Sequence, residues 1–349
     1  LATVCDVVPL AGLNRAFVTQ GLKVMRQRRN PGLRALADVA GLAAEPTSYH
    51  LGFVLGPRIN AGGRIGDSLL GAQLLTTDDD LKAAEIAATL DRLNTQRKAL
   101  ETAICEEAFA QADARLADHS DLPVIVAHGD TWHRGVVGLV ASRLAERFSR
   151  PAFAIAWDRD KTGAGSARSV TGVDIGSVVN AAHSEGLLIK GGGHAMAAGL
   201  TLERSRLDAF VEFLAQSIRL GSDEAARARE LKIDGALMPS GVNAELMSML
   251  ERAGPYGRGN PQPRFVLAAH RCTFAKVVGD AHVRCSLSAG DGSRIGAIAF
   301  RAADTALGAL LLGSDGMPLH IAGHLRRDQW GGRDRIELLI EDAADPRKL

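Results

Sequence analysis

Hydrophobic side chains recur at helical spacing over a long stretch in the first third of the chain. Residues 78–118 contain neither glycine nor proline, and their apolar positions follow one another at intervals of three, four and seven. The positions that carry the pattern are Ile86, Leu90, Leu93, Leu100 and Ile104. The spacing predicts one helix of about 40 residues, roughly 60 Å long, that connects two lobes. Two helices with a break between them are the alternative.

The chain opens with an apolar run, LATVCDVVPL, whose pattern is typical of a strand. Helical spacing follows over residues 12–28 and again over 33–42, with Pro31-Gly32 between them. A domain rarely begins inside its own buried strand. We therefore expect residues that precede Leu1 in the natural protein to be absent here.

The pattern after the long helix alternates between strands and helices. Strands are predicted over 122–127, 151–157 and 197–202, an extended segment over 165–170, and helices over 136–148, 175–183 and 205–219. Such alternation is typical of an α/β domain with a parallel or mixed sheet.

A charged and polar stretch at 221–232 has the composition of a linker, and the pattern then changes to short strands. Five strand-like runs are predicted, at 266–275, 282–288, 294–301, 318–325 and 335–341, with one helical insert near 303–312. This order favours a small β-barrel of the OB type. A generic β-sandwich is the alternative.

Composition adds few restrictions. The chain has 349 residues, 38 of them glycine, and a net charge of +1 from 41 basic and 40 acidic side chains, which neither indicates nor excludes a nucleic-acid partner. The four cysteines form no CxxC pair, so a zinc ribbon is not indicated. They lie in helix-like and strand-like runs, so we expect buried, reduced thiols and a cytoplasmic protein. No apolar stretch reaches the roughly 18 residues of a membrane span.

Two glycine-rich segments have the composition of anion sites. In GGGHAMAAG, which begins at Gly191, backbone N–H groups at Gly192 and Gly193 can approach an anion closely, and His194 follows at once. A tight turn between helix and strand is the alternative. In GAGSARS, Ser166 and Arg168 point to the same face of an extended strand, where they would grip a phosphate. An exposed edge strand is the alternative.

Two further segments carry arginine and histidine beside glycine. Arg58, Asn60 and Arg64 lie in LGPRINAGGR, which we read as a glycine-rich loop that is either functional or merely solvated. His133 and Arg134 lie between a strand and the start of a helix, where anions bind, whereas the adjacent Trp132 is more typical of packing.

Two isolated residues complete the candidates. Asp6 ends the opening strand, a position at which α/β proteins often place a metal ligand, although an aspartate there also caps turns. Trp330 lies beside Arg326 and Arg327 in the OB-like region. An aromatic ring with arginines is the usual combination for holding single strands, and a tryptophan that caps the barrel is the alternative.

Taken in order, six segments resemble the RecJ family of single-strand-specific exonucleases, within the DHH phosphoesterase superfamily. The segments are TVCDVVPL, LGPRINAGGR, TWHRGVVGLVASRL, GSARS, GGGHAMAAGLTL and GPYGRGNPQPRF. The resemblance extends over nearly the whole chain. It implies an α/β protein with the C-terminal part of a DHH catalytic domain at 1–77, a connecting helix at 78–118, a DHH-associated domain at 119–220 and an OB domain at 231–349.

The resemblance also implies an activity. Two Mn²⁺ or Mg²⁺ ions would activate a water for hydrolysis of single-stranded DNA from its 5′ end, in DNA repair and recombination. Asp6 would then be a metal ligand, Arg58, Ser166 and Arg168 would grip the 5′-terminal phosphate, and His194 with its glycines would face the catalytic lobe. The implied partners are a 5′-ended single strand, a single-strand-binding protein and a helicase, with the enzyme a monomer.

One departure from the family pattern separates the functional hypotheses. No Asp-His-His triplet occurs in these residues, so Asp6 is the single matched metal ligand and this chain alone is expected to be inactive. A non-catalytic module that binds single strands is one alternative. A phosphodiesterase for short RNA or cyclic dinucleotides is another, against which the OB-like region argues.

Overall fold

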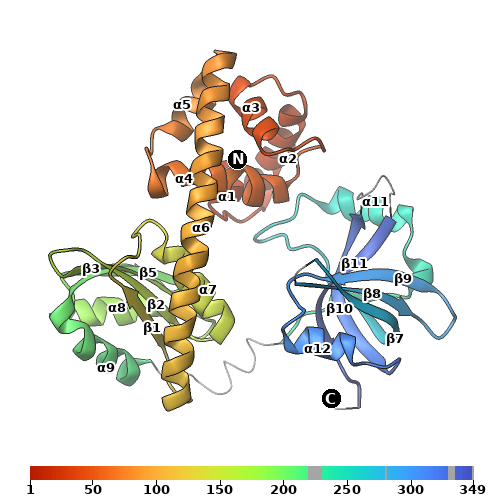
Figure 1. The fold of residues 1–349 in the computed structure, drawn as a ribbon. Helices are drawn as coiled ribbons and strands as arrows, with labels where there is room; N and C mark the ends of the chain where they lie inside the picture. The colour runs from red at the N-terminus through yellow and green to blue at the C-terminus, as the bar shows by residue number, and fades with distance from the viewer. Residues whose placement is uncertain (219–229, 280, 329–334, 348–349) are drawn as a thin grey trace. The chain divides into compact units, whose positions relative to one another are not determined.

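We describe the chain from a computed structural model, which places residues 1–218, 230–279, 281–328 and 335–347 (Figure 1). Its contacts divide the chain into two compact units. One unit runs from Val24 to Glu230, and the other combines Leu1–Lys23 with Leu231–Leu349. Most of the stretch interpreted as a linker, 221–232, lies outside the described residues. Among the residues that are described, none of the helices combines the length and apolar character that crossing a membrane requires.

A single long helix, α6 (Asp80–Asp118), runs through the first of these units (Figure 1). It begins at Asp79, whose carboxylate accepts hydrogen bonds from the backbone N–H groups of Leu81 at 2.8 Å and Lys82 at 3.2 Å. The helix is unbroken over 39 residues, or about 58 Å. The prediction of one long helix is therefore confirmed, and the alternative of two helices is wrong.

Three short helices pack against α6: α3 (Pro31–Val39), α4 (Gly56–Ile65) and α5 (Leu70–Thr76). The π-helix η1 (His50–Leu55) directly precedes α4. The reading of LGPRINAGGR as a loop is wrong, because these residues form α4. Pro57 is the second residue of α4, directly after the π-helical turn of η1. Gly62 lets α4 approach α6, since a Cβ there would lie 3.3 Å from Leu90.

The opening run is also helical rather than extended. Residues Ala2–Cys5 form the single turn α1, in which the N–H groups of Val4 and Cys5 both donate to the carbonyl of Leu1 at 3.1 Å. A strand needs a neighbouring strand to satisfy its backbone groups. In the described part of the chain no strand pairs with these residues, so a local turn satisfies them instead.

The beginning of the chain is held by the segment that precedes the barrel. The N–H of Leu10 donates to the carbonyl of Arg258 at 2.6 Å, and helix α2 (Gly12–Arg26) follows. From its first half, Arg15 donates to the carbonyl of Gly254 at 3.1 Å. These contacts explain why residues distant in sequence belong to one unit.

The α/β part of the first unit is a mixed five-stranded sheet in the order β1-β2-β3-β5-β4. Only β1 and β2 are parallel. The strands are β1 (Ile125–Gly129), β2 (Ala152–Trp157), β3 (Thr162–Arg168), β4 (Lys190–His194) and β5 (Ala197–Glu203). Two alternatives are wrong: β3 is paired on both sides rather than an edge strand, and the glycine cluster is strand β4 rather than a tight turn.

Alternating residue size along β2 decides which helices cover each face. Ala152, Ala154 and Ala156 face α6 and α7 (Val137–Phe148), which therefore lie close to the sheet. Phe153, Ile155 and Trp157 point the other way, into the core formed with α8 (Ile175–Ser184) and α9 (Leu207–Ser217). The α7 side is where β3 carries its polar residues.

The C-terminal part is a closed barrel of five strands, which confirms the OB-type prediction over the sandwich alternative. Strands β7 to β11 pair in the order β10-β11-β9-β8-β7, and pairing of β10 with β7 closes the ring. The strands are β7 (Phe265–Val278), β8 (His282–Ser288), β9 (Arg294–Ala299), β10 (Pro318–Asp328) and β11 (Arg335–Ala344). The short strand β6 (Gly235–Ala236) pairs in parallel with β7. Helix α11 (Ala244–Ala253) lies between β6 and β7 in the sequence, and α12 (Ala306–Leu312) lies between β9 and β10.

The close packing of β3 against side chains of β2 leaves no space for a side chain at one glycine. A Cβ at Gly163 would collide with the Trp157 ring and lie 2.8 Å from Ile155 Cγ2, whereas a Cβ at Gly199 in the neighbouring strand would meet nothing within 4 Å. We predict that Gly163→Ala lowers the free energy of unfolding by about 1–3 kcal/mol and that Gly199→Ala leaves it nearly unchanged. Urea denaturation measures both. If Gly163→Ala lowers the free energy of unfolding no more than Gly199→Ala does, the Trp157 ring can move aside and the prediction is wrong.

Candidate functional site

Strand β3 presents a hydroxyl and a guanidinium on one face of the sheet. Ser166 and Arg168 are two residues apart, so both point to the side opposite the buried Ala167. Helix α7 begins directly above them. A Cβ on Gly138, in the first turn of α7, would lie 3.3 Å from Nη2 of Arg168 and 3.5 Å from Oγ of Ser166. Glycine at this position therefore allows the two side chains to reach the start of the helix.

A second arginine arrives from helix α4. Arg64 lies in the last turn of α4, and its Nη1 donates to the carbonyl of Gly135 at 3.2 Å. The backbones meet closely there, because a Cβ at Gly135 would collide with the carbonyl oxygen of Arg64. The N–H of Gly135 in turn donates to Nδ1 of His133 at 3.0 Å. The helix end and the loop before α7 thus form one wall.

Arg64 and Arg168 are close enough to repel each other. Burial lowers the pKa of Arg168, and the positive charge of Arg64 lowers it further. Burial also lowers the pKa of Arg64, as does the nearby charge of Arg97, whereas the carboxylate of Glu101 raises it. Within the described ranges, neither Arg64 nor Arg168 forms an ion pair with a carboxylate, and each donates to a backbone carbonyl instead. An anion between them would relieve this repulsion.

An open cleft of about 580 Å³ lies beside these groups. Its walls include Arg64, His133, Arg134 and Ser166, together with the backbone of Gly135. The N-cap residue of α7 is Val136, whose side chain has no oxygen to bind the N–H groups at the positive end of that helix. The cleft therefore combines guanidinium groups, a hydroxyl and a helix N-terminus, which together suit a phosphate.

Strand register places His194 at the far edge of the same sheet. Arg168 pairs with Ala197, and Ala197 pairs with His194, so the three residues form one row across β3, β5 and β4. Ser166, Gly199 and Gly192 form the next row. The middle of this surface therefore carries only a methyl group and a glycine.

Two residues at this edge differ from what the sequence indicated. Lys190, which was not singled out, begins β4 and pairs with Thr201, in a row that continues to Ala164. The lysine directly before the glycine cluster is the signal that would have found it. A Cβ at Gly193 would collide with the carbonyl oxygen of Ala197, so this glycine serves the hairpin itself.

Two other candidates, Arg58 and Asn60, do not line the cleft. Arg58 turns toward α6, where its Nε donates to Asp91 at 2.8 Å and its Nη1 to the carbonyl of Val54 at 2.7 Å. Asn60 is exposed on α4 and does not line the cleft. Asp6 is exposed and caps α1 in the other unit. Trp330 lies outside the described residues.

Trp132 has the packing role that its position suggested. It is buried, and its Nε1 donates to a carboxylate oxygen of Glu107 at 2.7 Å. This bond anchors the loop before α7 to helix α6.

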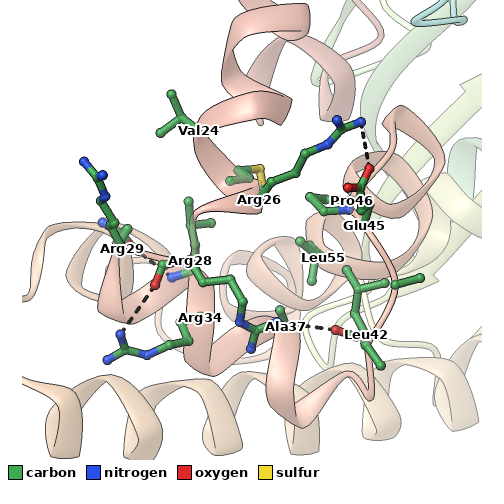
Figure 2. Close-up of a pocket in the computed structure, with 15 residues that line it drawn as sticks. Val24, Arg26, Arg28, Arg29, Arg34, Ala37, Leu42, Glu45, Pro46 and Leu55 are labelled. Carbon is green, nitrogen blue, oxygen red and sulfur yellow. Dashed lines mark hydrogen bonds and ion pairs between the residues drawn. The ribbon is translucent and has the colours of Figure 1, made fainter.

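A second cavity, of about 170 Å³, is lined by arginines of α2, of α3 and of the turn between them (Figure 2). Figure 2 shows Arg26 paired with Glu45, at 3.1 Å. Arg28 pairs with Asp38 and Arg34 with Asp80. Because these three guanidinium groups already have carboxylate partners, their charge is largely compensated. The cleft beside Arg64 and Arg168 is the stronger candidate for an anion.

Family models match both halves of this description. The model described as the DHHA1 domain matches residues 121–220, and the RecJ OB domain model matches residues 233–342. Two proteins named single-stranded-DNA-specific exonuclease RecJ are similar along the chain. The relative from Dickeya dadantii is 35% identical over 98% of this chain and 59% of its own length. The relative from Escherichia coli is 37% identical over 88% of this chain and 54% of its own length.

The chain is similar to RecJ exonucleases over most of its length. It spans slightly more than half the length of these two relatives. A crystal structure of RecJ from Thermus thermophilus in complex with Mn²⁺ has a TM-score of 0.81 at 30% identity, covering 99% of this chain and 48% of that one. The structure of the same RecJ in complex with Mg²⁺ has a TM-score of 0.80. The resemblance deduced from six short segments is thereby confirmed.

The metal ions of those RecJ structures have no matching site in the residues described here. No group of three or more histidine, cysteine, aspartate or glutamate side chains in the described ranges is placed to hold a metal ion. Asp6 contributes one carboxylate, whereas a divalent cation of this kind takes several oxygen ligands. The described residues therefore offer a cleft that suits an anion but not a set of metal ligands.

The opposite environments of two arginines lead to a test. Arg58 is paired with Asp91, so we predict that Arg58→Met lowers the free energy of unfolding by about 1–3 kcal/mol. Arg168 is repelled by Arg64 and has no ion pair with a carboxylate in the described ranges, so Arg168→Met should cost less than about 0.5 kcal/mol. Urea unfolding at low ionic strength measures both.

Inorganic phosphate provides the control for this comparison. It should raise the melting temperature of the wild-type chain and of Arg58→Met, but not that of Arg168→Met. If phosphate still raises the melting temperature of Arg168→Met but not that of Arg58→Met, the anion binds at Arg58 and the proposed site is wrong.

Proposed function

We propose that this chain forms the part of a RecJ exonuclease that recognises the 5′-terminal phosphate of single-stranded DNA. The observation that carries the proposal is the pair Arg64 and Arg168, which approach each other beside Ser166 without an ion-paired carboxylate in the described residues. Keeping two like charges together has a free-energy cost unless a ligand of opposite charge binds there. A terminal phosphate carries that charge and three oxygens to accept hydrogen bonds.

The arrangement of the cleft supports a terminal phosphate rather than one within a strand. The cleft is closed on one side, where the end of α4 meets the loop before α7 at Gly135. Guanidinium groups match phosphate oxygens in pairs, and the Ser166 hydroxyl and the start of α7 supply further donors. The bare surface at Ala197 and Gly199 leads away from Arg168 toward His194, which we propose as the wall beside the scissile bond.

The OB barrel supports a single-stranded substrate. Phe300 is exposed, His282 packs edge-on against its ring, and the guanidinium carbon of Arg326 lies 4.9 Å from the ring centre. On β7, Lys276 lies 5.8 Å from the ring centre of the exposed Phe274. Aromatic rings beside positive charges hold single strands by stacking and phosphate contact.

The whole activity is proposed for the longer protein. There, two Mn²⁺ or Mg²⁺ ions, with Asp6 among the ligands, would supply the activated water and stabilise the leaving oxygen, and hydrolysis would proceed from the 5′ end in DNA repair and recombination. We further propose a monomer that acts in the cytoplasm with a single-strand-binding protein and a helicase. The buried thiols of Cys105, Cys272 and Cys285, which form no disulfide, fit such a compartment.

Recognition of the 5′ phosphate is the first test. The wild-type chain should bind a 5′-phosphorylated oligodeoxynucleotide about tenfold or more tightly than its 5′-hydroxyl counterpart, because hydrogen bonds to charged groups contribute about 1.5–3 kcal/mol each. Arg168→Ala should remove this preference while affinity for the 5′-hydroxyl strand changes little. Fluorescence anisotropy measures both affinities.

Two comparisons accompany this measurement. Arg147→Ala removes an exposed arginine elsewhere on α7 and should leave the preference intact. Equal loss of affinity for both strands in Arg168→Ala would show that this residue maintains the fold or binds DNA generally, and would contradict the proposed role.

Hydrolysis is the second test. With Mn²⁺ and a 5′-phosphorylated single strand, this chain alone should bind the DNA but release no nucleotides, since its described residues contain no metal-ligand cluster. Chromatography of the reaction products measures release. Nucleotides released in proportion to the chain, and abolished by Asp6→Ala, would contradict the expectation of inactivity and support a complete metal site. Equal hydrolysis of dinucleotides and long strands would instead favour the short-RNA phosphodiesterase alternative.

A further inference from the structure

A row of side chains on the solvent side of one helix leads to the cleft beside Arg168. Helix η1 continues into α4 without interruption, so residues 50–65 form one rod. The row lies at intervals of four, four, three and four residues, which keeps it on one face. Its members are Tyr49, Phe53, Pro57, Asn60 and Arg64. The opposite face, with Leu51, Leu55 and Gly62, is buried.

Two aromatic rings stand at the far end of this row. Phe53 is 73% exposed and Tyr49 is 62% exposed. By contrast, Leu51 between them in the sequence is 2% exposed, and Leu55 after them is 0% exposed. The rings of Tyr49 and Phe53 are stacked, with centres 5.2 Å apart and planes 27° from parallel. They therefore form a fixed pair of rings on the surface of the helix, and neither belongs to its core.

Local structure holds the pair in place. The ring of His50 meets Tyr49 edge-on at 5.7 Å, and its Nδ1 accepts a hydrogen bond from the N–H of Thr47 at 3.1 Å. Burial lowers the pKa of His50, which favours the neutral ring that this bond requires. The π-helical turn widens the helix where the two rings lie, and such turns occur frequently at functional sites.

We propose that Tyr49 and Phe53 form a stacking platform for a nucleobase of the strand whose 5′ phosphate is held at Arg64 and Arg168. This inference rests on the proposed function. The row ends at Arg64, which lines the phosphate cleft. We infer that a strand fixed there by its terminal phosphate follows this row along the helix. Asn60 lies between the two ends and offers an amide to the strand.

The helix length sets where along the strand the contact falls. Phe53 and Arg64 are eleven residues apart, which is about 16 Å along the helix axis. Stacked nucleotides are separated by about 3.4 Å, and a strand drawn out along a protein needs fewer to cover the same distance. The base that meets the rings therefore lies within about the first five nucleotides.

Stacking on this platform predicts a position-dependent fluorescence signal. Oligodeoxynucleotides with a 5′ phosphate would carry 2-aminopurine at one position at a time, from the second to the eighth nucleotide, and would be titrated with the 349-residue chain. We expect quenching at one or two neighbouring positions within about the first five. Phe53→Leu, which keeps an apolar side chain without a ring, should remove the quenching and weaken binding of an octanucleotide about tenfold.

Two comparisons separate this inference from the proposed function. Leu81→Ala shortens an exposed apolar side chain at the start of α6, away from the row, and should behave as wild type. Phe53→Leu should retain the preference for a 5′ phosphate on a dinucleotide. A wild-type preference for the 5′ phosphate without quenching at any position would overturn the stacking platform alone. Absence of that preference in the wild-type chain would overturn the proposed function and the platform together.

A purely structural role for Phe53 gives a different result. If the ring packs against another polypeptide segment, Phe53→Leu would leave quenching and DNA affinity unchanged, and the platform would be wrong. Urea unfolding checks the variant itself. Because the side chain is mostly exposed, the free energy of unfolding should stay within about 0.5 kcal/mol of wild type.

Discussion

The candidate site depends on two positive charges that the fold holds together without an ion pair for either in the described residues. Arg64 comes from a helix and Arg168 from a strand about a hundred residues later, and the charge of Arg64 lowers the pKa of Arg168. Elsewhere in the same unit, arginines are paired with carboxylates: Arg58 forms an ion pair with Asp91, and Arg97 forms one with Glu101. The contrast marks the pair beside Ser166 as a place that an anion completes.

Close backbone packing is what makes this arrangement possible. The alanine face of β2 lets α6 and α7 lie near the sheet, and glycine at positions 135 and 138 brings the end of α4 and the start of α7 to the polar face of β3. Trp132 anchors the intervening loop to α6 through Glu107. The long helix therefore does more than connect two parts, because it holds the loop and α4 against the same surface.

Local patterns in the sequence predicted the elements well. The helix of 39 residues follows from its spacing, the five barrel strands follow from alternation and turn residues, and Ser166 and Arg168 share a face because a strand alternates. The errors at two glycine-rich segments have a common cause. LGPRINAGGR was interpreted as a loop, and a tight turn was the alternative for the cluster at residues 191–193. In α4 and β4, glycine instead serves close packing inside regular elements.

The roles of two arginines could not be separated by sequence alone. Arg58 and Arg64 flank the same motif, and a loop would have placed both at one site. Because the motif is a helix, a separation of six residues turns their side chains about 120° apart, so that Arg58 faces Asp91 and Arg64 faces the cleft. The partner of Arg58 lies 33 residues away and that of Arg64 lies 71 residues away, distances over which spacing patterns carry no information.

The proposed function requires that the cleft lined by Arg64 and Ser166, beside Arg168, receives a terminal phosphate. A crystal structure of this chain with a 5′-phosphorylated trinucleotide tests it most directly. We expect phosphate density within hydrogen-bonding distance of Ser166 Oγ and both guanidinium groups. Density for the phosphate in the cavity beside Arg26 and Arg34, or an empty cleft with the nucleotide bound only on the barrel, would contradict it.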